Sequence, residues 1–187
     1  MSLGLYLHIP YCFSKCRYCD FYSHPGERGV PEAYVDALLR ELSRFAPEAP
    51  LQPDTLYFGG GTPSLLRPEQ AKRLIDAARP MPGAEITLEA NPETVTEESL
   101  AGFREAGVNR ISFGVQSARD TQLRTLGRPH TAKQARAAFA AAQRAGFANI
   151  SGDIMLALPH YTEAEFDETL ELIEGGGATH ISAYLLK

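Results

Sequence analysis

The chain has 187 residues, of which 44% are hydrophobic, enough to bury the core of a single domain. Its 18 basic and 23 acidic residues give a net charge of −5 without a lysine- and arginine-rich stripe, which disfavours nucleic-acid binding. No apolar run approaches the length of a membrane span, so we expect no transmembrane segment.

Segments typical of strands and helices alternate along the whole chain. Residues 3–9 alternate between apolar and other side chains up to Pro10, which predicts a first strand. Apolar residues recur at helical spacing over residues 31–45, and Pro31 suits the first turn of a helix. The pattern then continues, with strands predicted at residues 55–58, 85–89, 110–114, 149–156 and 180–185 and helices at 68–78, 96–106, 133–145 and 163–173.

Six strands in strict alternation with helices predict parallel β-α-β units with right-handed crossovers. We therefore expect an α/β fold, either a barrel or an open doubly wound sheet, with ligands at the carboxyl ends of the strands. Thr96 is expected to open the helix at residues 96–106 and Gly107 to close it in a left-handed conformation. The chain stops at Lys187, directly after the sixth strand and without a helix to cover it, so we expect a fragment of a longer protein.

Cys12, Cys16 and Cys19 are the only cysteines and form a C-x-x-x-C-x-x-C array after the first strand. Three thiolates can hold three irons of a 4Fe-4S cluster and leave the fourth iron open to chemistry, whereas an electron-transfer cluster normally takes four thiolates. The odd number and the lack of a secretory signal disfavour disulfides and predict a reducing cytoplasm. A structural zinc site with His8 or His24 as fourth ligand is the alternative.

Three glycines follow the second strand in the stretch G-G-G-T-P, residues 59–63. Glycine lets the backbone approach a ligand closely, and the exposed amides with the Thr62 hydroxyl can bind a carboxylate or amino group. The stretch lacks the lysine and the spacing of a P-loop, so nucleotide phosphate is not the expected ligand. An ordinary tight turn is the equally open alternative.

Polar residues end the later strands. Glu89 ends the third strand, where a carboxylate can meet a cation or ribose hydroxyls, with a solvent-exposed acid as the alternative. Gln116 follows the fourth strand, and Arg128 adds a cation. Asp153 interrupts an apolar strand, where an unpaired buried carboxylate is costly. His130 is a candidate base or heme ligand, but we expect an ordinary histidine of a surface loop.

The chain resembles the radical S-adenosylmethionine (SAM) superfamily and, within it, the oxygen-independent coproporphyrinogen III oxidase-like group. The resemblance runs from residue 5 to about residue 184 and rests on ordered motifs that are jointly specific: Y-L-H-I-P-Y-C-F-S-K-C-R-Y-C-D-F, F-G-G-G-T-P-S, L-E-A-N-P, R-I-S-F-G-V-Q-S, L-G-R-P-H, D-I-M-L-A-L-P and H-I-S-A-Y. It implies an open, incomplete parallel (β/α)6 barrel. Residues 1–187 would be one truncated radical SAM core domain, without the C-terminal domain of the family.

The resemblance also implies the cofactors. Cys12, Cys16 and Cys19 would hold the 4Fe-4S cluster, and SAM would chelate the open iron through its amino and carboxylate groups. An electron from the reduced cluster would cleave SAM to methionine and a 5′-deoxyadenosyl radical, the cofactor supplying the chemistry and the protein the orientation. By family position, the residues that would line the SAM site, or complete it for a second SAM, are Tyr6, Tyr18, Gly60, Gly61, Thr62, Glu89, Gln116, Arg128 and Asp153.

Phe21 indicates the subgroup. Coproporphyrinogen dehydrogenases of this family carry a further cysteine two residues after the third cluster ligand, and here that position is Phe21. The sequence C-D-F-Y is instead similar to the HemW-type heme chaperones, which bind heme and the cluster and pass heme to acceptor proteins. The resemblance therefore implies heme or porphyrin, heme-accepting proteins and an electron donor such as flavodoxin or ferredoxin as partners.

Three functions remain as hypotheses. The leading one is a cytoplasmic radical SAM protein that delivers heme, with reductive SAM cleavage as its associated chemistry. The second is an oxygen-independent coproporphyrinogen III dehydrogenase of porphyrin biosynthesis. The third, from another class, is a zinc-stabilised α/β binding module without radical chemistry.

Overall fold

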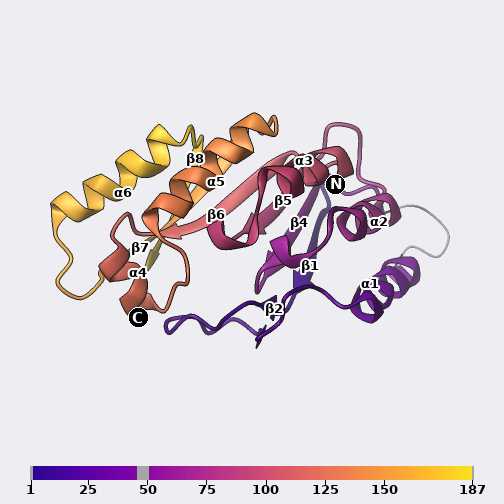
Figure 1. The fold of residues 1–187 in the computed structure, drawn as a ribbon. Coiled ribbons are helices and arrows are strands. Elements are labelled where there is room, and N and C mark those ends of the chain that lie inside the picture. Colours follow the sequence, from indigo (N-terminus) through magenta and orange to yellow (C-terminus); the bar gives the residue numbers. More distant parts are fainter. Residues whose placement is uncertain (1, 46–50, 187) are drawn as a thin grey trace.

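A parallel six-stranded sheet forms the centre of the structure, a computed structural model that describes residues 2–45 and 51–186 (Figure 1). Lys187, the last residue, lies outside the described ranges. The strands follow in spatial order as β1 (Gly4–Ile9), β4 (Thr55–Gly60), β5 (Glu85–Ala90), β6 (Arg110–Gln116), β7 (Asn149–Leu156) and β8 (His180–Leu185). Each neighbouring pair is parallel. Since β1 and β8 form opposite edges, the predicted open, incomplete barrel is confirmed.

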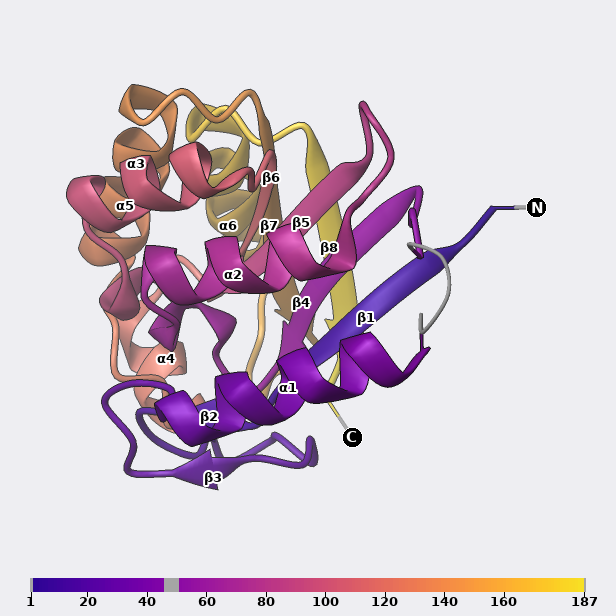
Figure 2. The same cartoon turned by 90° about the vertical axis from the view of Figure 1, so that its right-hand side faces the viewer.

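Helices cover one face of this sheet, as Figures 1 and 2 show. The crossovers contain α1 (Glu32–Phe45), α2 (Pro68–Ala78), α3 (Glu97–Ala106), α5 (Ala132–Arg144) and α6 (Glu163–Gly175). Thr96 caps α3 by accepting a hydrogen bond from Ser99 N at 3.1 Å, and Gly107 ends the helix with a φ of 114°, as predicted. Among the described residues, the helices fall short of the length and apolarity that a membrane crossing requires.

The sequence pattern decides which face of the sheet is covered. Alternate residues of a strand face opposite sides, and in-register neighbours of a parallel sheet share a side. One such row is wholly apolar and buried and packs against the helices; it consists of Leu7, Phe58, Leu88, Ile111 and Ile150. The next row along the strands is polar and contains Glu89, Ser112 and Ser151. The inner face of the barrel is therefore polar and available for ligands.

Several short elements were not predicted. The helix α4 (Asp120–Leu126) and the two 3-10 turns η1 (Pro63–Leu65) and η2 (Pro92–Thr94) lie at the carboxyl ends of the strands. The short strands β2 (Tyr11–Cys12) and β3 (His24–Pro25) pair with each other within the cysteine loop. These elements span two to seven residues, too few for a hydrophobic period to become visible.

Candidate functional site

A cavity of about 370 Å³ opens at the carboxyl ends of the strands, within the size range of small-molecule sites. The structure brings residues from the cysteine loop and from the ends of β4, β5, β6 and β7 to this one place. All three cysteines line the cavity, as do all predicted SAM-site residues except Tyr6: Tyr18, Gly60, Gly61, Thr62, Glu89, Gln116, Arg128 and Asp153.

The cysteine loop is held by contacts of its own and by contacts with the barrel. Pairing of β2 with β3 closes the loop. Lys15 Nζ donates to Phe21 O at 2.8 Å, which ties the stretch between the first two cysteines to the segment after the third. Arg17 N donates to Leu126 O at 3.0 Å and so docks the loop on α4. The three thiols are free and face the cavity from this ordered loop.

The glycines at the end of β4 allow the cysteine loop to approach. A Cβ atom on Gly61 would lie 2.7 Å from Tyr11 O and 2.9 Å from Cys12 Sγ, closer than side-chain carbons come to other atoms. Gly60 has a φ of 118°, a left-handed conformation that favours glycine. The run is therefore more than a tight turn, because it brings the end of β4 against the first cysteine.

Glu89 lies on the polar face of β5, where its two oxygens accept hydrogen bonds. Tyr57 donates its hydroxyl to Oε1 at 2.8 Å, and Gly60 N donates to Oε2 at 3.2 Å. Burial raises the pKa of Glu89, and the charge of Asp153 adds to the rise. The carboxylate is thus fixed in orientation at the cavity. Tyr57, which the sequence did not single out, is recognisable only through its place on the neighbouring strand.

Asp153 and Gln116 face the cavity from β7 and β6. Ser112 Oγ donates to Asp153 Oδ1 at 3.2 Å, and burial raises the pKa of this carboxyl. Gln116 follows a shift of strand register and has a φ of 69°, a strained conformation for a residue with a side chain. Only 7% of it is exposed, and its Oε1 has no hydrogen-bond partner among the described residues. Such an atom is satisfied when a ligand donates to it.

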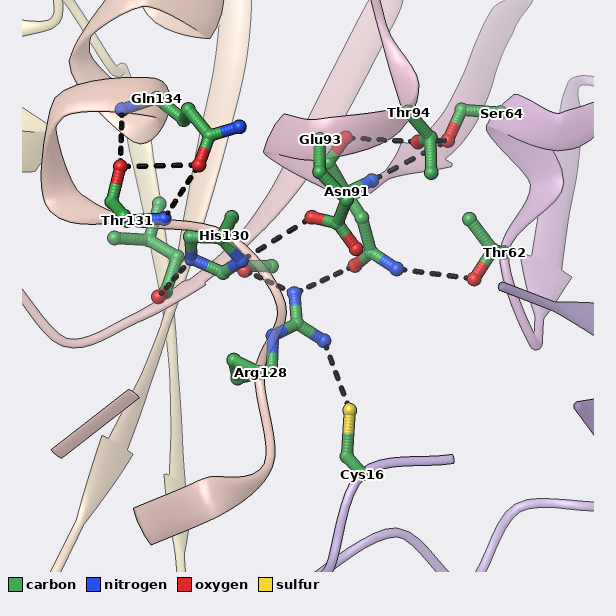
Figure 3. A network of polar contacts seen from close by, with 12 residues as sticks. Cys16, Thr62, Ser64, Asn91, Glu93, Thr94, Arg128, His130, Thr131 and Gln134 are labelled. Carbon is green, nitrogen blue, oxygen red and sulfur yellow. Dashed lines mark hydrogen bonds and ion pairs between the residues drawn. The ribbon is translucent and has the colours of Figure 1, made fainter. Parts of the chain in front are cut away.

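Arg128 is buried beside the cysteine loop (Figure 3). Its Nη1 donates to Cys16 Sγ at 3.5 Å, and its Nη2 donates to the Gly114 carbonyl. Burial works against the charged guanidinium, but Tyr18, Cys16 and Glu93 outweigh it and raise the pKa of Arg128. A permanent positive charge therefore stands next to a thiolate position at the cavity wall.

His130 is buried, so the expectation of a surface-loop histidine was wrong. Only 3% of it is exposed; its Nε2 lies 3.1 Å from Val115 O and its Nδ1 lies 3.3 Å from Glu93 Oε2. Burial alone would raise the pKa of Glu93, but His130 and Arg128 hold it below its usual value. His130 does not belong to the cavity lining and supports the wall behind Arg128. The sequence did not indicate the burial of His130, because the packing of a loop is decided by residues distant in the sequence.

Tyr6 lies outside the cavity lining on the same polar face of the sheet. Its ring stacks on Tyr57 with the ring centres 5.8 Å apart, and its hydroxyl lies 3.4 Å from His8 Nδ1. Tyr57 in turn holds Glu89. Direct contact of Tyr6 with a ligand stays a prediction, while the structure connects it to the cavity through Tyr57.

The donor set fits an iron-sulfur cluster better than a single zinc ion. Among the described residues, no group of three or more His, Cys, Asp or Glu side chains is gathered closely enough to hold one metal ion. His8, a candidate zinc ligand, has its Nε2 3.0 Å from Tyr22 O instead. The thiolate ligands of a cluster of several irons lie farther apart than the ligands of a single ion. Cysteine thiolates are soft ligands that suit such a cluster, and nearby hydrogen-bond donors suit the thiolates.

Comparisons with known proteins point to one family. The sequence profile of the Radical SAM superfamily matches residues 6–173. The chain is 38% identical to the heme chaperone HemW of Bacillus subtilis over 188 residues, which cover 97% of this chain and 49% of that protein. It is 40% identical to the heme chaperone HemW of Escherichia coli over 190 residues, which cover 98% of this chain and 50% of that protein. The chain thus spans about half the length of these curated relatives.

A solved structure with the same fold is the radical SAM enzyme coproporphyrinogen III oxidase (HemN) of Escherichia coli. The TM-score is 0.88 at 29% sequence identity, and the match covers all of this chain and 44% of that one. Three observations lead to one family: the profile match over most of the chain, the open parallel barrel and the three cysteines at the cavity. The chain belongs to the radical SAM superfamily.

Proposed function

We propose that this chain is the radical SAM core domain, residues 1–187, of a cytoplasmic protein that binds heme and delivers it to acceptor proteins. The observation that carries the proposal is the opening of Cys12, Cys16 and Cys19 onto one cavity with the strand-end residues. In this arrangement the three thiolates would hold a 4Fe-4S cluster, which supplies the electron for SAM cleavage when it is bound.

The cavity residues divide into three roles in this proposal. Glu89 and Asp153 present carboxylates to hydroxyl or amino groups of SAM. Gln116 offers its Oε1, which has no hydrogen-bond partner in the described part of the chain, to a donor on the same ligand. Arg128 offers a buried positive charge to the SAM carboxylate. Each of these side chains is already oriented by neighbouring strands or loops, so little conformational entropy is lost on binding.

Phe21 and the relatives support the heme-delivery branch. Phe21 lines the cavity mouth and is 67% exposed, at the position where the dehydrogenases carry a further cysteine. The chain is similar to HemW heme chaperones at 38–40% identity. An oxygen-independent coproporphyrinogen III dehydrogenase is the second candidate, favoured by the likeness in fold to the Escherichia coli enzyme. A phenylalanine in place of the additional thiol speaks against it.

Anaerobic reconstitution with iron and sulfide tests the cluster. We expect close to four irons per chain and an absorbance that falls on reduction by dithionite. Reduced protein should convert SAM to 5′-deoxyadenosine, and Cys16→Ala should abolish this product. Iron uptake of one ion per chain, or zinc retained in place of iron, would contradict the cluster.

Heme titration and transfer test the delivery function. We expect the reconstituted chain to bind heme with a shift of the Soret absorbance and to release it to an apoprotein that needs heme, with flavodoxin or ferredoxin as electron donor. Conversion of coproporphyrinogen III without heme transfer would instead establish the dehydrogenase.

A further inference from the structure

A connected path of hydrogen bonds links two of the three cysteines from the barrel side. Figure 3 shows the part of this path from Cys16 to Thr62. Arg128 Nη1 donates to Cys16 Sγ at 3.5 Å, and Arg128 Nη2 donates to Asn91 Oδ1 at 2.7 Å. Asn91 Nδ2 donates to Thr62 Oγ1 at 3.1 Å. Thr62 Oγ1 then donates to Cys12 Sγ at 3.5 Å. The path runs from thiolate to thiolate through three side chains.

This path is held in place by the barrel. Thr62 and Arg128 are buried, and Asn91 is half-buried in the loop after β5. The Asn91 carbonyl accepts hydrogen bonds from the backbone amide and the hydroxyl of Thr94, at 3.0 and 2.9 Å. Arg128 N donates to Leu123 O at 2.8 Å. Because these contacts hold Asn91 and Arg128 in place on the barrel, the donors keep their orientation toward the two sulfurs.

The guanidinium has enough donors for two tasks. Its Nη1 and Nη2 serve Cys16, Asn91 and the Gly114 carbonyl. Its buried Nε has no hydrogen-bond partner among the described residues. A guanidinium carries five N–H donors, and the contact with Cys16 uses Nη1 alone. That contact can therefore persist while another donor of Arg128 meets SAM.

We propose that Thr62, Asn91 and Arg128 form a thiolate clamp that sets the reduction potential of the cluster, an inference that rests on the proposed function. Reduction adds one electron, taken from an external reductant, and increases the negative charge on the cluster and its thiolates. Hydrogen bonds and a cation at the sulfurs stabilise the more negative form. The clamp makes the cluster easier to reduce, and Asn91 acts as a positioning residue between the two donors.

The reduction potential of the reconstituted chain without SAM tests the clamp. We expect Arg128→Gln and Thr62→Val each to make one-electron reduction about tenfold less favourable, a shift of about −59 mV. Asn91→Ala, which removes no contact to sulfur, should shift the potential in the same direction by less. The measurement is an anaerobic dithionite titration followed by absorbance and electron paramagnetic resonance.

Two matched controls exclude general effects of the substitutions. Arg119→Gln removes a surface arginine that pairs with Glu168, and Thr125→Val removes an exposed hydroxyl that donates to Thr121 O. Both should retain the parent potential and iron content.

Three outcomes separate the possibilities. Parent potentials in both Arg128→Gln and Thr62→Val, with full iron content, would overturn the clamp and leave the cluster standing. If Arg128→Gln does not hold the cluster, the potential of the nearly isosteric Thr62→Val decides whether the clamp exists. If the parent chain itself takes up no cluster, the proposed function fails first, and that result is distinct from an unshifted potential.

Discussion

Gly61→Ala tests whether the glycine run exists to admit the cysteine loop. The added Cβ would lie 2.7 Å from Tyr11 O and 2.9 Å from Cys12 Sγ, whereas ordinary contact begins at 3.4 Å. The difference requires the Tyr11 carbonyl to move by about 0.7 Å and the sulfur by about 0.5 Å, if the end of β4 stays in place. Metal–ligand distances vary by only about 0.2 Å, so the displaced sulfur could bind only if the cluster moved with it. The variant should therefore hold its cluster poorly.

The cost in stability follows from the same overlap. An extra methyl group in a filled site costs about 1–3 kcal/mol, and each kcal/mol lowers the melting temperature of a chain of this size by about 2–4 °C. We expect the apoprotein to melt about 2–12 °C below the parent, by circular dichroism, and iron content after anaerobic reconstitution to fall. Gly29→Ala is the matched control, because its nearest contact would be Leu65 O at 3.9 Å. Full iron content and an unchanged melting temperature in Gly61→Ala would refute the reasoning.

Further predictions concern the polar face and the helix layer. Asp153→Asn should raise the stability of the apoprotein at pH 7. Burial raises the pKa of this carboxyl, so its ionised form destabilises the fold at that pH. The gain in stability should vanish as the pH falls below the unfolded-state pKa of about 3.9. Equal gains at pH 3 and pH 7 would contradict this. Tyr57→Phe removes the hydrogen bond to Glu89. The variant should keep its full iron content but bind SAM about fivefold more weakly, ~1 kcal/mol, as measured by equilibrium dialysis. Gly176→Ala places a Cβ 2.6 Å from the ring of Phe139 in α5 and should lower the free energy of unfolding by denaturant by about 1–3 kcal/mol. Gly175→Ala, where no atom of the described residues lies within 4 Å of the added Cβ, should not lower it, and equal effects would contradict the packing argument.

Local pattern was sufficient for the class of fold. The period-two apolar residues of the strands and the helical spacing between them predicted an α/β fold, either a barrel or an open doubly wound sheet, because burial of one face leaves that mark on the sequence itself. The open barrel in particular was implied by the resemblance to the radical SAM superfamily. Thr96 and Gly107 marked the ends of α3 for equally local reasons, a side-chain cap and a left-handed backbone. The spacing of Cys12, Cys16 and Cys19 likewise belongs to one short loop.

The composition of the site depended on strand register. Residues far apart in sequence meet only because the carboxyl ends of parallel strands share one edge, so Asn91 beside Arg128 and Tyr57 beside Glu89 could not be paired in advance. The prediction for His130 was wrong for the same reason, since the loop that carries it is buried by β6 and Glu93.

The sequence by itself determined the class of fold, the cysteine array and the polar residues at the strand ends. The tertiary structure decided which of those residues share a cavity, which of them are buried, and which donors reach the sulfurs. The physical reason is one of range. Hydrophobic period, capping and loop spacing act between residues a few positions apart. Burial and hydrogen-bond partners at the site come from segments far apart in the sequence, as Asn91 and Arg128 are.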